Sequence, residues 1–246
     1  MVDRLLDKQV RLLEYLTSSN AIFGDRGDRA IDLTCWGNSR ALLDLEARFS
    51  HEKRMHKITA VFPRTFELLG NHRAEIVRQF VRACPPTDID RLRNAQQFRE
   101  FLCARGQGEP FLLPYLVDVS ACEFACAVVR VGTENSRPLP DNGGVKPSQG
   151  WIRRRSGLIL QRCAYDVRSV FEGGSAEDVP AERETLLVIG MSDSDEQPRI
   201  SEVLPVIFSI LSILDDWTDP AGFGDTQELS ELLRQMEQHG LIEVRP

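Results

Sequence analysis

The chain has 246 residues, of which 42% are apolar and 27% are charged, and its formal net charge is −7. No apolar run approaches the roughly 18 residues that a bilayer-spanning helix needs, so the composition predicts a water-soluble globular protein without a membrane partner. Since domains commonly contain about 100 to 150 residues, the length predicts two of them.

The first part of the chain has the periodicity of amphipathic helices. Apolar residues recur at every third or fourth position from Leu5 to Leu16 and again from Leu42 to Phe49. The first of these stretches places acids and bases among its leucines, which distinguishes it from a secretory signal. We therefore expect a cytoplasmic protein.

Further helices are expected on both sides of a proline pair. The stretch from Ile76 to Val81 has helical spacing, and this helix must end near Cys84 because Pro85 and Pro86 disfavour helical geometry. Asp88 is predicted to cap the next helix, which would point Ile89, Leu92, Phe98, Phe101 and Leu102 inward. Another helix is expected from about Pro114, with Leu116, Val119, Cys122, Cys126 and Val129 inward. Residues 1–131 thus read as an all-α domain of five to seven helices.

The composition changes at Gly132. Residues 132–150, GTENSRPLPDNGGVKPSQG, are rich in glycine and proline and nearly lack large apolar residues, which is typical of an interdomain linker or a long loop.

Residues 151–246 predict a second, smaller domain. The segments SGLILQRCAYDV and ETLLVIGMS are short and rich in β-branched residues, which is typical of strands. Pro205 then suits the first turn of an apolar helix, and Asp225 or Thr226 suits the cap of another, which Gly240 would end before a terminal LIEV strand. The predicted fold class is therefore α+β: an N-terminal helical domain followed by a small winged-helix-like α/β domain.

Signatures of catalysis and of metal binding are missing. His51 and His56 are five residues apart, so roughly 500° of helical rotation would point their rings in different directions. No nucleophile elbow, phosphate-binding loop or dinucleotide-binding loop occurs. Cys122 and Cys126 would share a helix face, which leaves open a metal, a regulatory disulfide or simply two buried thiols. We predict that the chain is not itself an enzyme and carries no cofactor.

Residues 62–125 resemble a family of accessory proteins that work beside multinuclear iron oxidases of TIM-barrel fold. These proteins take part in the biosynthesis of ribosomally made, post-translationally modified peptides, including the methanobactin and thiaglutamate pathways, and the family was once labelled as DNA-binding. The positions that carry the resemblance are Phe62, Pro63, Leu69, Gly70, Phe80, Pro85, Pro86, Phe98, Phe101, Leu102, Pro114, Tyr115, Leu116, Asp118 and Glu123. The segments SGLILQRCAYDVRSVFEGG, TLLVIG and ELLRQMEQHGLIEV follow the family's second domain more loosely.

The resemblance implies a division of labour. The partner oxidase supplies the iron and modifies a cysteine of a precursor peptide, while the second domain of this chain holds the leader of that peptide by strand addition. For the peptide-binding residues we expect an edge strand and the helix beside it: Thr185, Leu187, Ile189, Met191, Leu229, Leu232, Leu233 and Met236. The alternative for the four helix residues, Leu229 to Met236, is that they belong to the hydrophobic core. Among them, Met236 is the one that we most expect to contact the peptide.

The same resemblance implies a surface that docks the oxidase on the helical domain. The expected docking residues are Pro85, Pro86, Phe98, Phe101, Pro114 and Tyr115. An internal corner of the fold is the alternative reading of these positions.

A DNA-binding transcriptional regulator is the alternative function, because winged-helix topology is common in such proteins. Residues 151–246 hold 9 basic and 18 acidic side chains, a net charge of −9, whereas nucleic-acid binding depends on cations. The cluster Arg153, Arg154 and Arg155 is the exception, and it also suits an anchor for acidic side chains. Nucleic acid is therefore not the expected partner.

Overall fold

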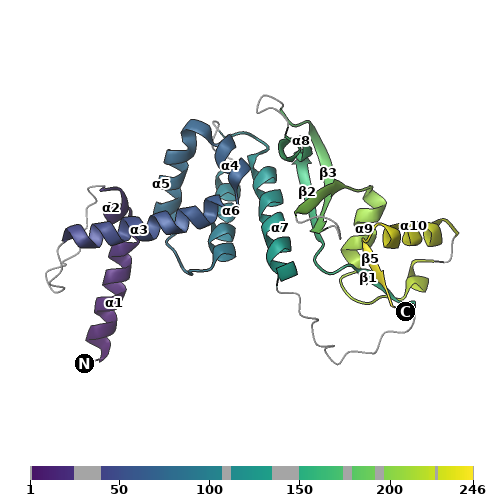
Figure 1. Cartoon of the computed structure of the whole chain (residues 1–246), viewed down its shortest axis with the longest axis horizontal. Helices are drawn as coiled ribbons and strands as arrows, with labels where there is room; N and C mark the ends of the chain where they lie inside the picture. The colour runs from purple at the N-terminus through teal and green to yellow at the C-terminus, as the bar shows by residue number, and fades with distance from the viewer. Residues whose placement is uncertain are drawn as a thin grey trace. The chain divides into compact units, whose positions relative to one another are not determined.

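The computed structural model separates into two compact units, Met1–Ser120 and Ala121–Pro246 (Figure 1). The division falls inside one helix, α7, rather than in the glycine-rich segment that follows it. The residues that the structure describes are 2–24, 40–106, 112–134, 150–173, 179–191, 197–224 and 227–245.

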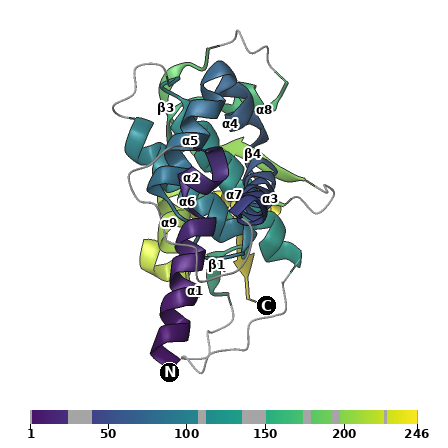
Figure 2. The same ribbon diagram turned by 90° about the vertical axis from the view of Figure 1, so that its left-hand side faces the viewer.

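The first unit is helical throughout its described residues, as the sequence predicts. The C-terminal end of α1 and the short α2 lie beside α3 (Figures 1 and 2). The helices of this unit are α1 (Val2–Leu16), α2 (Ser19–Phe23), α3 (Arg40–Thr59), α4 (Pro63–Leu68), α5 (Arg73–Ala83), α6 (Arg91–Gly106) and the start of α7 (Leu116–Glu134), with a 3₁₀ turn η2 (Gly70–His72).

An aromatic cluster forms the core of this unit. The ring of Phe98 lies 5.1 Å from that of Phe66, 5.1 Å from that of Phe80 and 5.6 Å from that of Phe62, and all four side chains are buried. Aromatic side chains bury large apolar areas, so truncating any of them costs about 3 to 5 kcal/mol. The cluster therefore fixes α4, α5 and α6 together.

A buried arginine holds the corner after α5. Arg54 donates to the carbonyl of Cys84 at 2.9 Å, to Oδ1 of Asn94 at 2.8 Å and to Oε1 of Gln97 at 2.6 Å. Gln97 in turn donates to the carbonyl of Pro85 at 3.0 Å. Burial lowers the pKa of Arg54 to about 10, so it stays charged at neutral pH. The proline pair thus sits in a corner that hydrogen bonds make rigid.

The cap of α6 differs from the prediction. Asp90, not Asp88, accepts a hydrogen bond from the backbone of Arg93 at 2.8 Å, and Asp88 accepts one from the backbone of Asp90. The helix therefore starts later than predicted, and Ile89, expected to point inward, precedes it with 86% of its surface exposed.

The second unit combines helices with two small antiparallel sheets, so the mixed α+β class is confirmed. Its elements are α7 from Ala121 onward, β1 (Ile152–Arg154), β2 (Ile159–Tyr165), α8 (Arg168–Phe171), β3 (Glu182–Met191), β4 (Pro198–Glu202), α9 (Pro205–Ile213), a 3₁₀ turn η3 (Pro220–Phe223), α10 (Gln227–Gln238) and β5 (Ile242–Val244).

The larger sheet has the strand order β2-β3-β4, with β3 in the middle. Residues 185–190 of β3 are all buried, which is the pattern of a strand covered on both faces. On one face, Cys163 of β2 contacts Cys122 of α7, with 3.9 Å between the sulfurs. On the other face, Val188 packs with Leu211 of α9 and Met236 of α10.

The smaller sheet pairs β1 with β5 and is attached to the end of α10. Gly240 has φ +66°, and the backbone N–H of Leu241 donates back to the carbonyl of Met236 at 2.8 Å. This is a Schellman ending, which a glycine in the left-handed region allows. It confirms Gly240 as the stop of the helix and turns the chain directly into β5.

Two of the predicted features lie at or beyond the limit of the described residues. The segment 132–150, expected to be a linker, begins inside α7, which continues to Glu134, and residues 135–149 are outside the described part. The proposed caps Asp225 and Thr226 are also outside it.

Candidate functional site

A groove of about 1040 Å³ lies beside β4 in the second unit. Arg199 and Ser201 of β4 line one wall, and the opposite wall is formed by the end of α10 and the start of β5, residues 237–243. Val188 and Ile207 add apolar surface between them. The groove therefore combines apolar surface with a strand that, among the described residues, pairs with β3 alone.

The free edge of β4 presents backbone groups of alternate residues. The N–H of Val203 donates to the carbonyl of Leu186 at 2.9 Å, so the backbone of Val203 faces β3. In an antiparallel ladder this orientation alternates, which turns Ser201 and Arg199 toward β3 as well. The N–H and C=O groups of Ile200 and Glu202 consequently point away from the sheet, where a guest strand can pair with them.

Gly190 leaves room for the side chain of Leu158, which also lines the groove. A Cβ atom at this position would lie 2.2 Å from the side chain of Leu158, which immediately precedes β2. Any larger residue would displace Leu158 and with it the apolar surface that both residues contribute to the groove.

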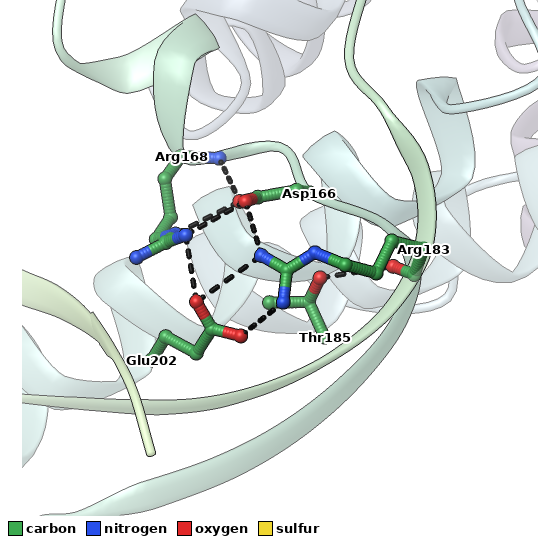
Figure 3. A network of polar contacts seen from close by, with 5 residues as sticks. All are labelled: Asp166, Arg168, Arg183, Thr185 and Glu202. Atoms are coloured by element: carbon green, nitrogen blue, oxygen red, sulfur yellow. Dashed lines mark hydrogen bonds and ion pairs between the residues drawn. The ribbon is translucent and has the colours of Figure 1, made fainter. Parts of the chain in front are cut away.

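A network of four charged side chains fixes Glu202, the C-terminal residue of β4 (Figure 3). Arg168 pairs with Asp166 and with Glu202, at 2.7 Å in each case. Arg183 reaches the same two carboxylates at 2.6 Å and 2.5 Å, and its own carbonyl accepts from Thr185 at 2.9 Å. The hydrogen bonds from Arg168 hold the pKa of Asp166 well below its usual range, aided by those from Arg183. The network holds Glu202, whose backbone faces outward, in a defined position.

The charges on the two groove walls differ in how they are partnered. Glu243 of β5 accepts from Arg153 at 2.8 Å and is therefore neutralised. Arg199 on β4 and Glu237 on α10 are exposed, and neither forms an ion pair with another residue of the described ranges. Arg199 is thus an exposed cation on a groove wall that also carries apolar side chains.

The arginine cluster at the start of the second domain anchors acidic side chains. Besides bonding Glu243, Arg153 stacks on Trp217 at 4.5 Å. Arg154 pairs with Asp215 and donates to the carbonyl of Leu211 at 3.0 Å. These contacts fit the anchoring interpretation of the cluster rather than a phosphate-binding one.

The prediction that β3 forms the sheet edge is wrong. Thr185, Leu187 and Ile189 are fully buried, and their strand pairs with β2 and β4 on its two sides. The run TLLVIG lacks alternation because both of its faces are covered, and this was the signal in the sequence of a central strand. Met191, at the end of the strand, is half-buried and does line the groove.

The predicted helix residues lie between the groove and the core. Met236 is 1% exposed and belongs to the core cluster, so its interpretation as a surface contact is wrong. Leu229, Leu232 and Leu233 are half-buried and pack against the same cluster. The core alternative therefore describes these four side chains better.

The residues expected to dock the oxidase divide into two groups. Phe98, Phe101 and Tyr115 are buried, which fits the internal-corner alternative, while Pro85, Pro86 and Pro114 are exposed. Pro86 lines a second hollow of about 670 Å³ in the helical unit.

The exposed apolar residues around that hollow make up what we call the α1 surface. Leu13 of α1 and Ile89 line the hollow with Pro86, and 61% and 86% of the respective leucine and isoleucine surfaces are exposed. Leu5 and Leu6 of α1 are also exposed, by 59% and 58%. Exposed apolar side chains that gather at one place, as Leu13, Pro86 and Ile89 do at this hollow, are typical of a protein-binding surface.

The candidate metal ligands do not gather into a group in the described parts of the chain. There, no three His, Cys, Asp or Glu side chains come close enough to hold an ion. The sulfur of Cys122 lies 3.9 Å from that of Cys163, and burial raises the pKa of Cys126 to about 11, which keeps that thiol protonated.

Comparison of the chain with protein-family models gives no match, and neither does comparison with curated protein sequences. In the described ranges, every helix is too short or too polar to cross a membrane.

Proposed function

We propose that this chain is a non-catalytic partner subunit that binds the leader of a precursor peptide and presents it to an iron-dependent oxidase. The guest peptide adds to β4 as a further strand and lies in the groove beside it. The observation that carries the proposal is the free edge of β4, where the backbone groups of Ile200 and Glu202 point outward beside a groove lined by both polar and apolar side chains.

The edge of β4 and its surroundings suit an extended guest. Two outward-facing residues offer about four backbone hydrogen bonds, each worth about 1 kcal/mol net. Backbone pairing of this kind supplies affinity, and pockets for alternate side chains supply selectivity. The charge network at Glu202 supports binding further because a strand that is already fixed loses little entropy when the guest arrives. The winged-helix-like arrangement, in which strands β1 to β4 precede helices α9 and α10 and a last strand β5, is part of this proposal.

The chemistry resides on the partner in this account. We assign iron and the modification of a peptide cysteine to a TIM-barrel multinuclear oxidase, which would dock on the α1 surface around Leu13, Pro86 and Ile89. These residues replace the buried Phe98 and Tyr115 as contacts, because a buried side chain cannot meet a partner without unfolding.

The DNA-binding alternative fits the observations less well. The second domain carries a net charge of −9, and its basic cluster is occupied by Glu243 and Asp215. Because Arg153 and Arg154 are paired with these carboxylates, the attraction of this domain to phosphates would be weak.

Coexpression with the products of neighbouring genes tests the division of labour. The chain should purify in a complex that contains iron, whereas the chain alone should be metal-free. Stoichiometric iron on the isolated chain would contradict the proposal, and so would specific binding to duplex DNA at physiological salt.

A further inference from the structure

We propose that the groove beside β4 selects a guest segment with the pattern apolar-x-apolar-x-acidic, and that the acidic side chain pairs with Arg199. The inference rests on the proposed function and specifies the chemical class of peptide that this groove takes.

The side chains of alternate β4 residues define where the guest's own side chains lie. Arg199 and Ser201 line the groove, as does Val203 just beyond the strand. Their backbone groups face β3, so a guest residue opposite each of them would not share hydrogen bonds with it. Such pairs bring side chains closest together, with Cα atoms about 4.5 Å apart. The guest side chains that contact the groove are therefore those opposite Arg199, Ser201 and Val203.

Two of these three positions call for apolar side chains. A guest residue opposite Ser201 or Val203 projects over the apolar part of the groove, where Val188, Ile207 and Leu204 contribute surface. Leu204 is 64% exposed, so a guest side chain would remove apolar area from water there. A polar side chain at these positions would lose hydration without gaining a partner.

The third position calls for an acid because Arg199 is exposed and forms no ion pair with the described residues around it. Its guanidinium can give a carboxylate two parallel hydrogen bonds. A partly exposed pair of this kind is worth up to about 1 kcal/mol, which corresponds to about fivefold in affinity.

The antiparallel orientation fixes the order of the pattern. Both strand pairings in the larger sheet are antiparallel, and such ladders are slightly more stable per residue than parallel ones. An antiparallel guest runs from Val203 toward Arg199. Read from its N-terminal side, the guest therefore presents an apolar residue, then a second apolar residue, then the acid.

Glu237 offers a matched control because it is the other unpaired charge among the described residues that line the groove. It lies in the last turn of α10, on the opposite wall, and has no register position on β4. If general electrostatics governed selection, replacing Glu237 would change the preferred guest as much as replacing Arg199.

Selection from a randomised peptide display library tests the inference with the full-length chain. Enriched peptides should carry the apolar-x-apolar-x-Asp or Glu pattern, and Arg199→Glu should shift the acidic position to Lys or Arg, while Glu237→Lys leaves it acidic. The Glu version of an enriched peptide should bind about fivefold more tightly than its Gln version.

The outcomes separate the two proposals. Enriched peptides that need the β4 edge but show no acidic preference, or keep it in Arg199→Glu, would overturn the inference and leave the proposed function standing. Enrichment no greater than on Ile200→Pro, a variant that removes one outward amide, would overturn the proposed function itself.

Discussion

Replacing Ile200 with proline should weaken guest binding without affecting folding, because it removes a single outward-facing backbone N–H. The N–H of Ile200 points away from the sheet and has no partner in the ladder, so proline removes a donor that only a guest strand would use. Edge strands tolerate proline at such positions. Ser201 is the contrasting site, because its N–H faces β3 and pairs with Val188.

Proline at position 200 should mainly lower guest affinity, whereas proline at position 201 should mainly lower the free energy of unfolding. Ile200→Pro removes one of about four guest hydrogen bonds, which costs about 0.5 to 1.5 kcal/mol, and the proline ring obstructs the approach of the guest. We expect guest affinity to fall about tenfold, while the free energy of unfolding changes by less than about 1 kcal/mol. Ser201→Pro leaves a buried carbonyl unpaired and should lower that free energy by about 1 to 3 kcal/mol.

Fluorescence anisotropy with a library-selected peptide measures the affinity, and urea unfolding measures the stability. Ile200→Thr is the matched control because it keeps the amide and a β-branched side chain, so its affinity should remain close to that of the wild type. Unchanged affinity of Ile200→Pro, with stability intact, would refute the assignment of β4 as the guest-binding edge. A comparable loss in Ile200→Thr would transfer the effect from the backbone to the side chain.

Three further predictions concern the core, the α1 surface and the charge network. Met236→Ala should lower the free energy of unfolding by about 2 to 5 kcal/mol in urea titration, since the side chain is buried; a change below about 0.5 kcal/mol would contradict its core role. Ile89→Asp should change stability by less than about 0.5 kcal/mol yet prevent copurification with the metal oxidase, and retained copurification would move the docking surface elsewhere. The depressed pKa of Asp166 contributes stability above the unfolded value of about 3.9 that is lost as pH falls below it, so Asp166→Asn should flatten the acid dependence of the urea midpoint; an unaltered slope would contradict this.

The helical elements could be predicted from the sequence because their signals are local. Proline at 85 and 86 ends α5, and Gly240 ends α10 through its left-handed conformation, each by a steric effect that a single residue imposes. The cap of α6 was misplaced because Asp88 and Asp90 are both good capping residues. The choice of Asp90 coincides with two hydrogen bonds from the Asn94 side chain to this turn, contacts that spacing alone does not reveal.

The position of the candidate site could not be predicted because it depends on one unrecognised strand. β4 is short, begins with Pro198 and carries charged residues, which are the features of an edge strand but also of a loop. Without β4, the sequence indicates only one neighbouring strand for β3 and predicts β3 as the edge. The continuous apolar run from Leu186 to Ile189 could have corrected this, since an edge strand with one solvated face alternates.

Amide hydrogen exchange at Ile200 and Glu202 tests the central claim most directly, because these are the outward-facing donors of β4. Resolved by NMR on the full chain with and without a library-selected peptide, both amides should exchange rapidly when free and become strongly protected when the peptide is bound. Bound peptide that protects neither amide, or amides already protected in the free chain, would contradict strand addition at this edge.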